Sequence, residues 1–176
     1  MRCMAMILAA VLTAGGSAAA SDLTVFVTNG WTASSHCDDR TGKFLQCMAY
    51  ASHQDGISVV VGVDQRRRWT LGFGNMKWHM AAASVPFSYS FDGGAWKSAR
   101  GSVSNRTFLT VDLDSNKHLS DLLARSRFME IEANGDEYYL PLFDIPTVLA
   151  KLADCVRLQA DQSCTRLVPC PMLGAH

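Results

Sequence analysis

The stretch Gly30-Trp31-Thr32-Ala33-Ser34-Ser35-His36-Cys37 decides the fold, and Cys47 follows it on the next extended segment. Its composition and its place after an Asn-Gly turn signal are typical of a β-strand. Trp31 is the largest side chain of the stretch, so we expect it to fill the core beside that strand. We also expect Cys37 and Cys47 to form a disulfide that links the two strands across a short polar turn. The stretch therefore indicates a structural scaffold rather than a catalytic motif.

The first twenty residues have the features of an export signal. Arg2 supplies a positive charge, residues 4–12 are apolar, and Ser17-Ala18-Ala19-Ala20 offers the small side chains of a cleavage site. The apolar run is too short to span a membrane, and no later stretch reaches the roughly 18 apolar residues of a transmembrane helix. The sequence therefore predicts a periplasmic or secreted protein with no integral membrane segment after signal cleavage.

The remaining length fits one domain. Cleavage after Ala20 leaves 156 of the 176 residues, and a chain of that size buries a core of its own. We predict a signal peptide over 1–20, a single β-rich domain over 21–160 and an irregular tail over 161–176.

The charge of the chain argues against a nucleic-acid partner. Sixteen acidic and fifteen basic residues follow Ala20, so the exported chain is nearly neutral. The densest basic run is Arg66-Arg67-Arg68. We interpret this run as a solvated hairpin turn, with a patch for an anionic partner as the alternative.

Five cysteines follow the signal segment, and export favours disulfides over free thiols. Besides Cys37 and Cys47, the chain has Cys155, Cys164 and Cys170 near its end. A bond from Cys155 to Cys164 or to Cys170 would tie the tail to the last helix, and the spacing does not choose between them. The odd number leaves one thiol that is free or paired with another molecule.

Alternating and β-branched runs predict an antiparallel meander through most of the chain. Two dipeptides, Asp55-Gly56 and Asn134-Gly135, are typical of tight hairpin turns. The segment 75–86 is compatible with a loop, an edge strand or one helical turn. The expected strands span 23–28, 31–37, 43–52, 57–63, 69–74, 87–91, 95–100 and 106–113, with a hairpin over 128–142.

Helical spacing follows the meander. Leu119, Leu122 and Leu123 recur three and four positions apart, which predicts a short helix over 117–126. Its candidate N-caps are Asp114, Ser115 and Ser120.

A second helix is expected to open at Asp144-Ile145-Pro146, because proline favours the first helical turn and an apolar stripe follows. The chain is therefore expected to be mainly β. We predict an antiparallel β-sandwich or partly closed barrel with two short helices near the C-terminus.

No catalytic motif stands out in the sequence. It contains no G-x-S-x-G segment, and each histidine is isolated in its local context. Paired carboxylates at 38–39 and 136–137 fall in expected turns, where carboxylates are solvated. The alternative is a periplasmic hydrolase whose site assembles in space from scattered His and Asp residues. The histidines are His36, His53, His79, His118 and His176.

One short segment carries possible metal ligands. Met76, His79 and Met80 offer thioether and imidazole groups, which suit Cu(I) in an oxidising compartment. We interpret the segment as a core or edge piece rich in methionine and tryptophan, with copper handling as the alternative. No cofactor is expected.

Several of these features together resemble a known family. An export signal, a Gly-Trp strand with spaced cysteines, an all-β body and the closing helix Leu149-x-x-Leu152-x-x-Cys155 are similar to the invasion-associated locus B family of small exported alphaproteobacterial proteins. The resemblance covers residues 23–156 and implies a non-enzymatic β-sandwich linked to host-cell interaction. Cys164, Cys170 and the proline-containing tail depart from it. We therefore expect a disulfide-stabilised protein that binds another envelope or host protein.

Overall fold

The computed structural model describes residues 23–38 and 40–159. Its described part consists of antiparallel strands and two helices. In chain order these are β1 (Leu23–Thr28), β2 (Trp31–Cys37), β3 (Phe44–Ser52), β4 (Ile57–Asp64), β5 (Trp69–Asn75), β6 (Ser84–Phe91), β7 (Lys97–Asn105), β8 (Phe108–Asp112), α1 (Lys117–Leu123), β9 (Phe128–Ala133), β10 (Asp136–Pro141) and α2 (Ile145–Gln159).

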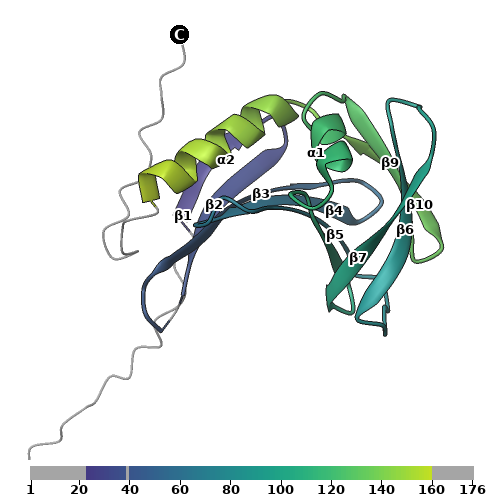
Figure 1. The fold of residues 1–176 in the computed structure, drawn as a ribbon, viewed down its shortest axis with the longest axis horizontal. Coiled ribbons are helices and arrows are strands. Elements are labelled where there is room, and N and C mark those ends of the chain that lie inside the picture. The colour runs from purple at the N-terminus through teal and green to yellow at the C-terminus, as the bar shows by residue number, and fades with distance from the viewer. Residues whose placement is uncertain (1–22, 39, 160–176) are drawn as a thin grey trace, which may run out of the picture.

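The strands form one open ten-stranded sheet in the order β1-β2-β3-β4-β5-β8-β7-β6-β9-β10. The expected fold class, mainly β and antiparallel with two helices late in the chain, is confirmed. Figure 1 shows the sheet curving strongly from β1 to β10, with α1 and α2 on the same side of it. The export segment and the tail, for which 1–20 and 161–176 are predicted, lie outside the described residues.

Both hairpin turns expected from the sequence are present. Asn134 and Gly135 have φ angles of 55° and 86° and join β9 to β10. These positive angles are what a tight turn between two twisted strands requires. Residues 53–56 join β3 to β4, with the Gly56 N–H donating to the His53 carbonyl over 3.0 Å. Local turn chemistry therefore sets the register of both hairpins.

The N-cap of the short helix α1 lies one residue after Ser115, the nearest candidate before the helix. The Asn116 side chain accepts a hydrogen bond from the Leu119 N–H over 3.2 Å, so Asn116 is the N-cap. The candidates Asp114, Ser115 and Ser120 are therefore wrong. Ser115 is held instead by Asp112, which accepts from its N–H over 3.3 Å and leaves Asn116 to open the helix.

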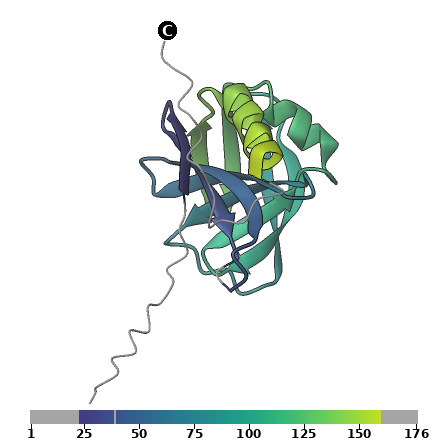
Figure 2. The same ribbon diagram turned by 90° about the vertical axis from the view of Figure 1, so that its left-hand side faces the viewer.

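A single core lies between the sheet and the two helices. Trp31 is 1% exposed, as expected from its place in β2. The apolar stripe of α2, with Val148, Leu152 and Val156, is buried, and the helix packs on β2, β3 and β4. Figure 2 shows α2 lying across one face of the curved sheet. The stripe predicted from periodicity is therefore the surface that closes the core.

The turn between β1 and β2 meets the loop that follows β10 at one corner of the molecule. The Trp31 indole N–H donates to the Phe143 carbonyl over 2.9 Å. The next residue, Asp144, accepts hydrogen bonds from the side chains of Asn29 and Thr28. These contacts join the β1–β2 turn to the loop that follows β10. The corner contacts thus bring the open sheet toward closure without a strand ladder between β1 and β10.

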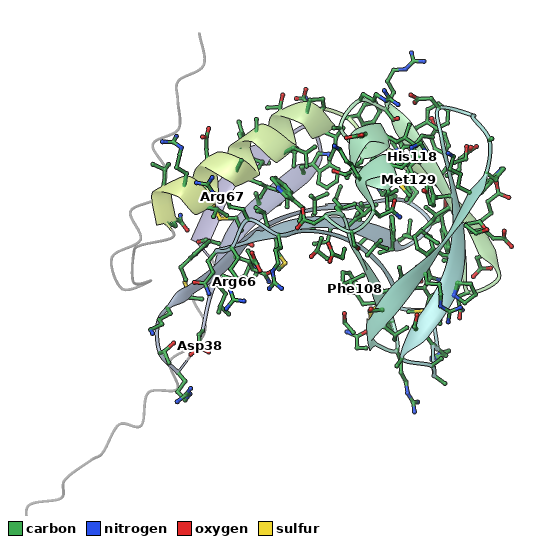
Figure 3. All side chains as sticks on the ribbon, viewed as in Figure 1. Asp38, Arg66, Arg67, Phe108, His118 and Met129 are labelled. Atoms are coloured by element: carbon green, nitrogen blue, oxygen red, sulfur yellow. A yellow bond between two sulfur atoms is a disulfide. The ribbon has the colours of Figure 1, made fainter. Side chains whose placement is uncertain are left out.

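On the sheet face away from the helices, one aromatic ring lies over two glycines of β5. A Cβ built on Gly72 would lie 2.5 Å from the Phe108 ring, and one built on Gly74 would lie 2.7 Å from it. Phe108 projects from this face in Figure 3. The ring occupies the space that side chains at these two positions would take, so the glycines and Phe108 form one packing unit.

The expected Cys37–Cys47 disulfide is wrong. Cys47 is bonded to Cys155 of α2, 108 residues away in sequence, so the expected bond from Cys155 to Cys164 or Cys170 is also wrong. The two side chains lie in different surroundings. Cys47 is fully buried on the sheet face that α2 covers. Cys37 is only partly buried and follows a shift in the register between β2 and β3. Cys37 is itself disulfide-bonded. Cys164 and Cys170 lie outside the described residues.

Candidate functional site

The turn between β4 and β5 is organised by one carboxylate. Asp64 accepts hydrogen bonds from the backbone N–H groups of Arg66 and Arg68, over 2.8 Å and 3.0 Å. Its second oxygen lies 2.7 Å from the Arg68 guanidinium. Burial acts to raise the pKa of Asp64, but the hydrogen bonds from Arg68 and Arg66 outweigh it and lower that pKa. The carboxylate therefore stays ionised and holds the turn.

The same turn keeps Arg67 in a left-handed backbone conformation, with φ of 61°. Such a conformation costs a non-glycine residue about 1–2 kcal/mol. The Arg67 N–H donates to the Asp64 carbonyl over 2.8 Å, which secures it. Figure 3 shows Arg67 on the α2 side of the turn and Arg66 away from that helix. The turn thus directs one of its three arginines toward α2.

A groove of about 200 Å³ lies between this turn and the last turns of α2. Val63, Trp69 and Val156 give it apolar walls, and Arg67 and Arg157 stand at its rim. The groove lies beside the disulfide, because Val63 pairs with Cys47 in the sheet and Val156 follows Cys155. The bond therefore fixes the α2 wall against the β4 wall.

Basic side chains gather at this end of the molecule. The β2–β3 turn carries Arg40 and Lys43, and a hydrogen bond of 3.1 Å from the Gln65 N–H to the Leu45 carbonyl holds the two turns together. Arg157 pairs with Asp154 over 3.0 Å at an exposed position. Of the charged residues that line the groove itself, Arg67 and Arg157 are cations and Asp154 is a carboxylate. Two cations and one carboxylate therefore line the groove, and Arg157 is paired with that carboxylate.

The histidines that a scattered hydrolase site would need lie on separate elements. His36 is on β2, His53 in the β3–β4 turn, His79 in the loop after β5, and His118 on α1. His176 lies outside the described residues. Within 23–38 and 40–159, no group of three His, Cys, Asp or Glu residues is placed to hold a metal ion.

The three candidate copper ligands are not presented together. Met76 is 83% exposed, whereas Met80 is 4% exposed and belongs to the core. His79 lies between them at the surface. A metal ion bound by all three residues needs their side chains to converge on one point. Here the Met76 thioether faces solvent and the Met80 thioether is buried in the core.

A buried polar network, which the sequence did not reveal, lies at the end of the sheet near β10. The Tyr138 hydroxyl accepts from the Trp78 indole N–H over 2.9 Å and from the Asn75 side chain over 3.3 Å. It donates to Asp136 over 3.2 Å. Burial raises the pKa of Tyr138, and the Trp78 hydrogen bond opposes that rise. A hydroxyl with all these partners is typical of a structural network rather than a reactive group.

His53 lies in the neighbouring β3–β4 turn. Its Nε2 atom is buried and has no hydrogen-bond partner. Burial lowers the pKa of His53, and the charge of Asp55 opposes this only in part. At pH values above its ordinary pKa of 6.5 the imidazole is therefore neutral.

Comparison with protein-family models, curated proteins and solved structures finds no match to the chain. Among the described residues, neither helix has the length and apolar character needed to cross a bilayer.

Proposed function

We propose that this protein is an exported, disulfide-stabilised binding protein that docks another protein and catalyses no reaction. The observation that carries the proposal is the Asp64-held turn, which keeps Arg67 strained beside an apolar groove. Strained backbone persists where the surrounding structure enforces it, and it clusters at functional sites. Arginine and tryptophan are also the residues that most often dominate protein interfaces.

The disulfide supports an extracytoplasmic location. Bonds such as Cys47–Cys155 persist in oxidising compartments and are rare in the cytosol. The export signal proposed for residues 1–20 agrees with that compartment. A periplasmic or secreted protein with this surface would meet envelope proteins or host proteins. Host-cell interaction, which the resemblance to the invasion-associated locus B family implies, is the case in which the partner is on the host.

The polar groups away from the groove support binding over catalysis. Tyr138 is engaged by Trp78, Asn75 and Asp136, and His53 is neutral in a turn. General acid–base chemistry needs a titratable group within reach of a substrate. The Tyr138 hydroxyl instead joins Asn75, Trp78 and Asp136 at one end of the sheet.

Photo-crosslinking in the cell tests the proposal. A benzophenone amino acid is placed at Ala153 beside the groove, at Tyr50 on the sheet face away from the helices, and at Tyr139 on β10, all of them exposed. We expect a discrete adduct from Ala153 in the exported, oxidised protein. An adduct from Tyr50 or Tyr139 alone would support binding and place the partner elsewhere. The absence of an adduct from all three positions would overturn the proposed function.

A further inference from the structure

We propose that the groove between the β4–β5 turn and α2 binds an acidic segment of a partner protein, which inserts one apolar side chain into it. The inference rests on the proposed function and adds the chemistry of the partner. In this proposal the apolar walls contact the inserted side chain, and Arg67 pairs with a carboxylate next to it in the partner.

The size of the groove favours a single side chain as occupant. Pockets for drug-sized molecules are typically about 300–1,000 Å³, and this groove has about 200 Å³. Val63 and Val156 are buried and Trp69 is partly buried, so the inner wall is apolar. An aliphatic or aromatic side chain that displaces water from such walls gains free energy through burial of apolar area. A small hollow of this kind suits an anchor residue of a larger partner.

Charge selects the residues beside the anchor. Arg157 shares its guanidinium with Asp154, whereas Arg67 makes no ion pair with any described residue. A guanidinium matches a carboxylate with two parallel hydrogen bonds. Acidic residues next to the anchor therefore complement this end of the molecule.

The probe is a labelled synthetic peptide with one central leucine flanked by Asp and Glu residues. Two control peptides replace the leucine with serine, or the acidic residues with lysine. Fluorescence anisotropy follows their binding to the full, oxidised exported chain. We expect saturable binding of the acidic leucine peptide, weaker binding of the serine peptide, and no binding of the lysine peptide. High salt should weaken the binding, because the ionic contacts lie at a solvent-exposed rim.

Two arginine variants provide a matched comparison. Arg67→Ala should weaken binding at least about tenfold, since it removes a charge-assisted contact. Arg66→Ala removes the same charge from the same turn but not from the groove, so its effect should stay within about twofold. Arg67→Gly retains access to the left-handed backbone and removes the side chain. It should also lose binding while its unfolding stays cooperative, which separates lost contact from lost structure.

Several results would overturn the inference. Equal losses in Arg66→Ala and Arg67→Ala would indicate unspecific charge attraction. Equal binding of the leucine and serine peptides would remove the anchor. Binding to vesicles of phosphatidylglycerol that exceeds peptide binding would assign the basic end to a membrane surface. No binding of the acidic leucine peptide, together with a crosslinked partner at Tyr50 or Tyr139, would reject the groove and leave the proposed function standing.

Discussion

Arg67 occupies a backbone conformation that glycine or asparagine adopts at lower cost. Its φ of 61° is held by hydrogen bonds to Asp64 rather than by any preference of arginine. Asn134 and Asp144 also have positive φ angles, but their short polar side chains tolerate this region. The arginine side chain that we propose for binding therefore comes with a backbone conformation that lowers the stability of the fold.

Replacing Arg67 with glycine should stabilise the fold. Relief of the left-handed strain outweighs the added flexibility of the unfolded chain, so we expect a rise of up to about 1 kcal/mol in the unfolding free energy. Urea unfolding of the oxidised protein measures it. Arg66→Gly is the control, because Arg66 has no positive φ angle, and it should leave stability unchanged or reduce it. A loss of stability in Arg67→Gly would contradict the strain argument.

His53 should make the fold less stable in mild acid. Burial lowers the pKa of His53 below its ordinary 6.5. Between that value and the lower folded pKa, the unfolded chain binds more protons than the folded one, so stability falls as the pH falls through this window. Urea unfolding at about pH 7.5 and about pH 5.5 measures the change, and His53→Gln should lessen it. An identical pH dependence in the variant would remove His53 as a cause.

The packing of β5 against β8 leaves room for the Phe108 ring because two glycines of β5 lie beneath it. Gly72 and Gly74 have no side chains where Phe108 crosses them, and a Cβ atom at either position would lie closer to the ring than Cβ atoms come in real proteins. Alternation alone places Phe108 on a strand but does not reveal which residues face it across the sheet. The packing unit therefore belongs to the pairing of the two strands.

Gly72→Ala should destabilise the protein by about 1–3 kcal/mol, because the new methyl group displaces the Phe108 ring. In a Phe108→Ala background the same change should be neutral or stabilising, since alanine is less flexible than glycine in the unfolded chain. Urea unfolding of the two single variants and the double variant gives the coupling free energy. Additive effects would show that the ring and the glycine do not interact.

At the scale of the whole fold, one disulfide links the third strand, β3, to the last helix, α2. Cys47 and Cys155 close a loop that spans most of the described chain. The same bond lies beside the groove and fixes α2 against β4 through Val156 and Val63. Its loss should therefore affect both stability and the shape of the candidate site.

Removing this bond in a Cys47→Ala, Cys155→Ala double variant should lower the unfolding free energy by about 4–5 kcal/mol. The expectation follows from the entropy that a cross-link of this span removes from the unfolded chain. Urea unfolding measures the loss, and non-reducing peptide mass mapping should first show Cys47 linked to Cys155 in the parent protein. A Cys47–Cys37 peptide would contradict the structure, and a loss below about 1 kcal/mol would contradict the entropy argument.

Many local features of the fold were accessible from the sequence. The turn at Asn134-Gly135, the strand around Trp31 and the stripe of α2 depend on residues close together in the chain. The polar network around Tyr138 left no such signal, because Asn75 and Trp78 reach it from another part of the chain. Capping tendency alone does not single out Asn116, because the adjacent Asp114 and Ser115 are equally suited to cap a helix.

Periodicity and turn chemistry were sufficient to predict an antiparallel, mainly β chain with two late helices, because both act between near neighbours in sequence. They could not predict the partner of Cys47, since that depends on which sheet face α2 covers. The groove is likewise a product of the folded molecule. Arg67 and Trp69 come from one hairpin and Arg157 from the last helix, and only packing of the apolar stripe onto the sheet brings them together.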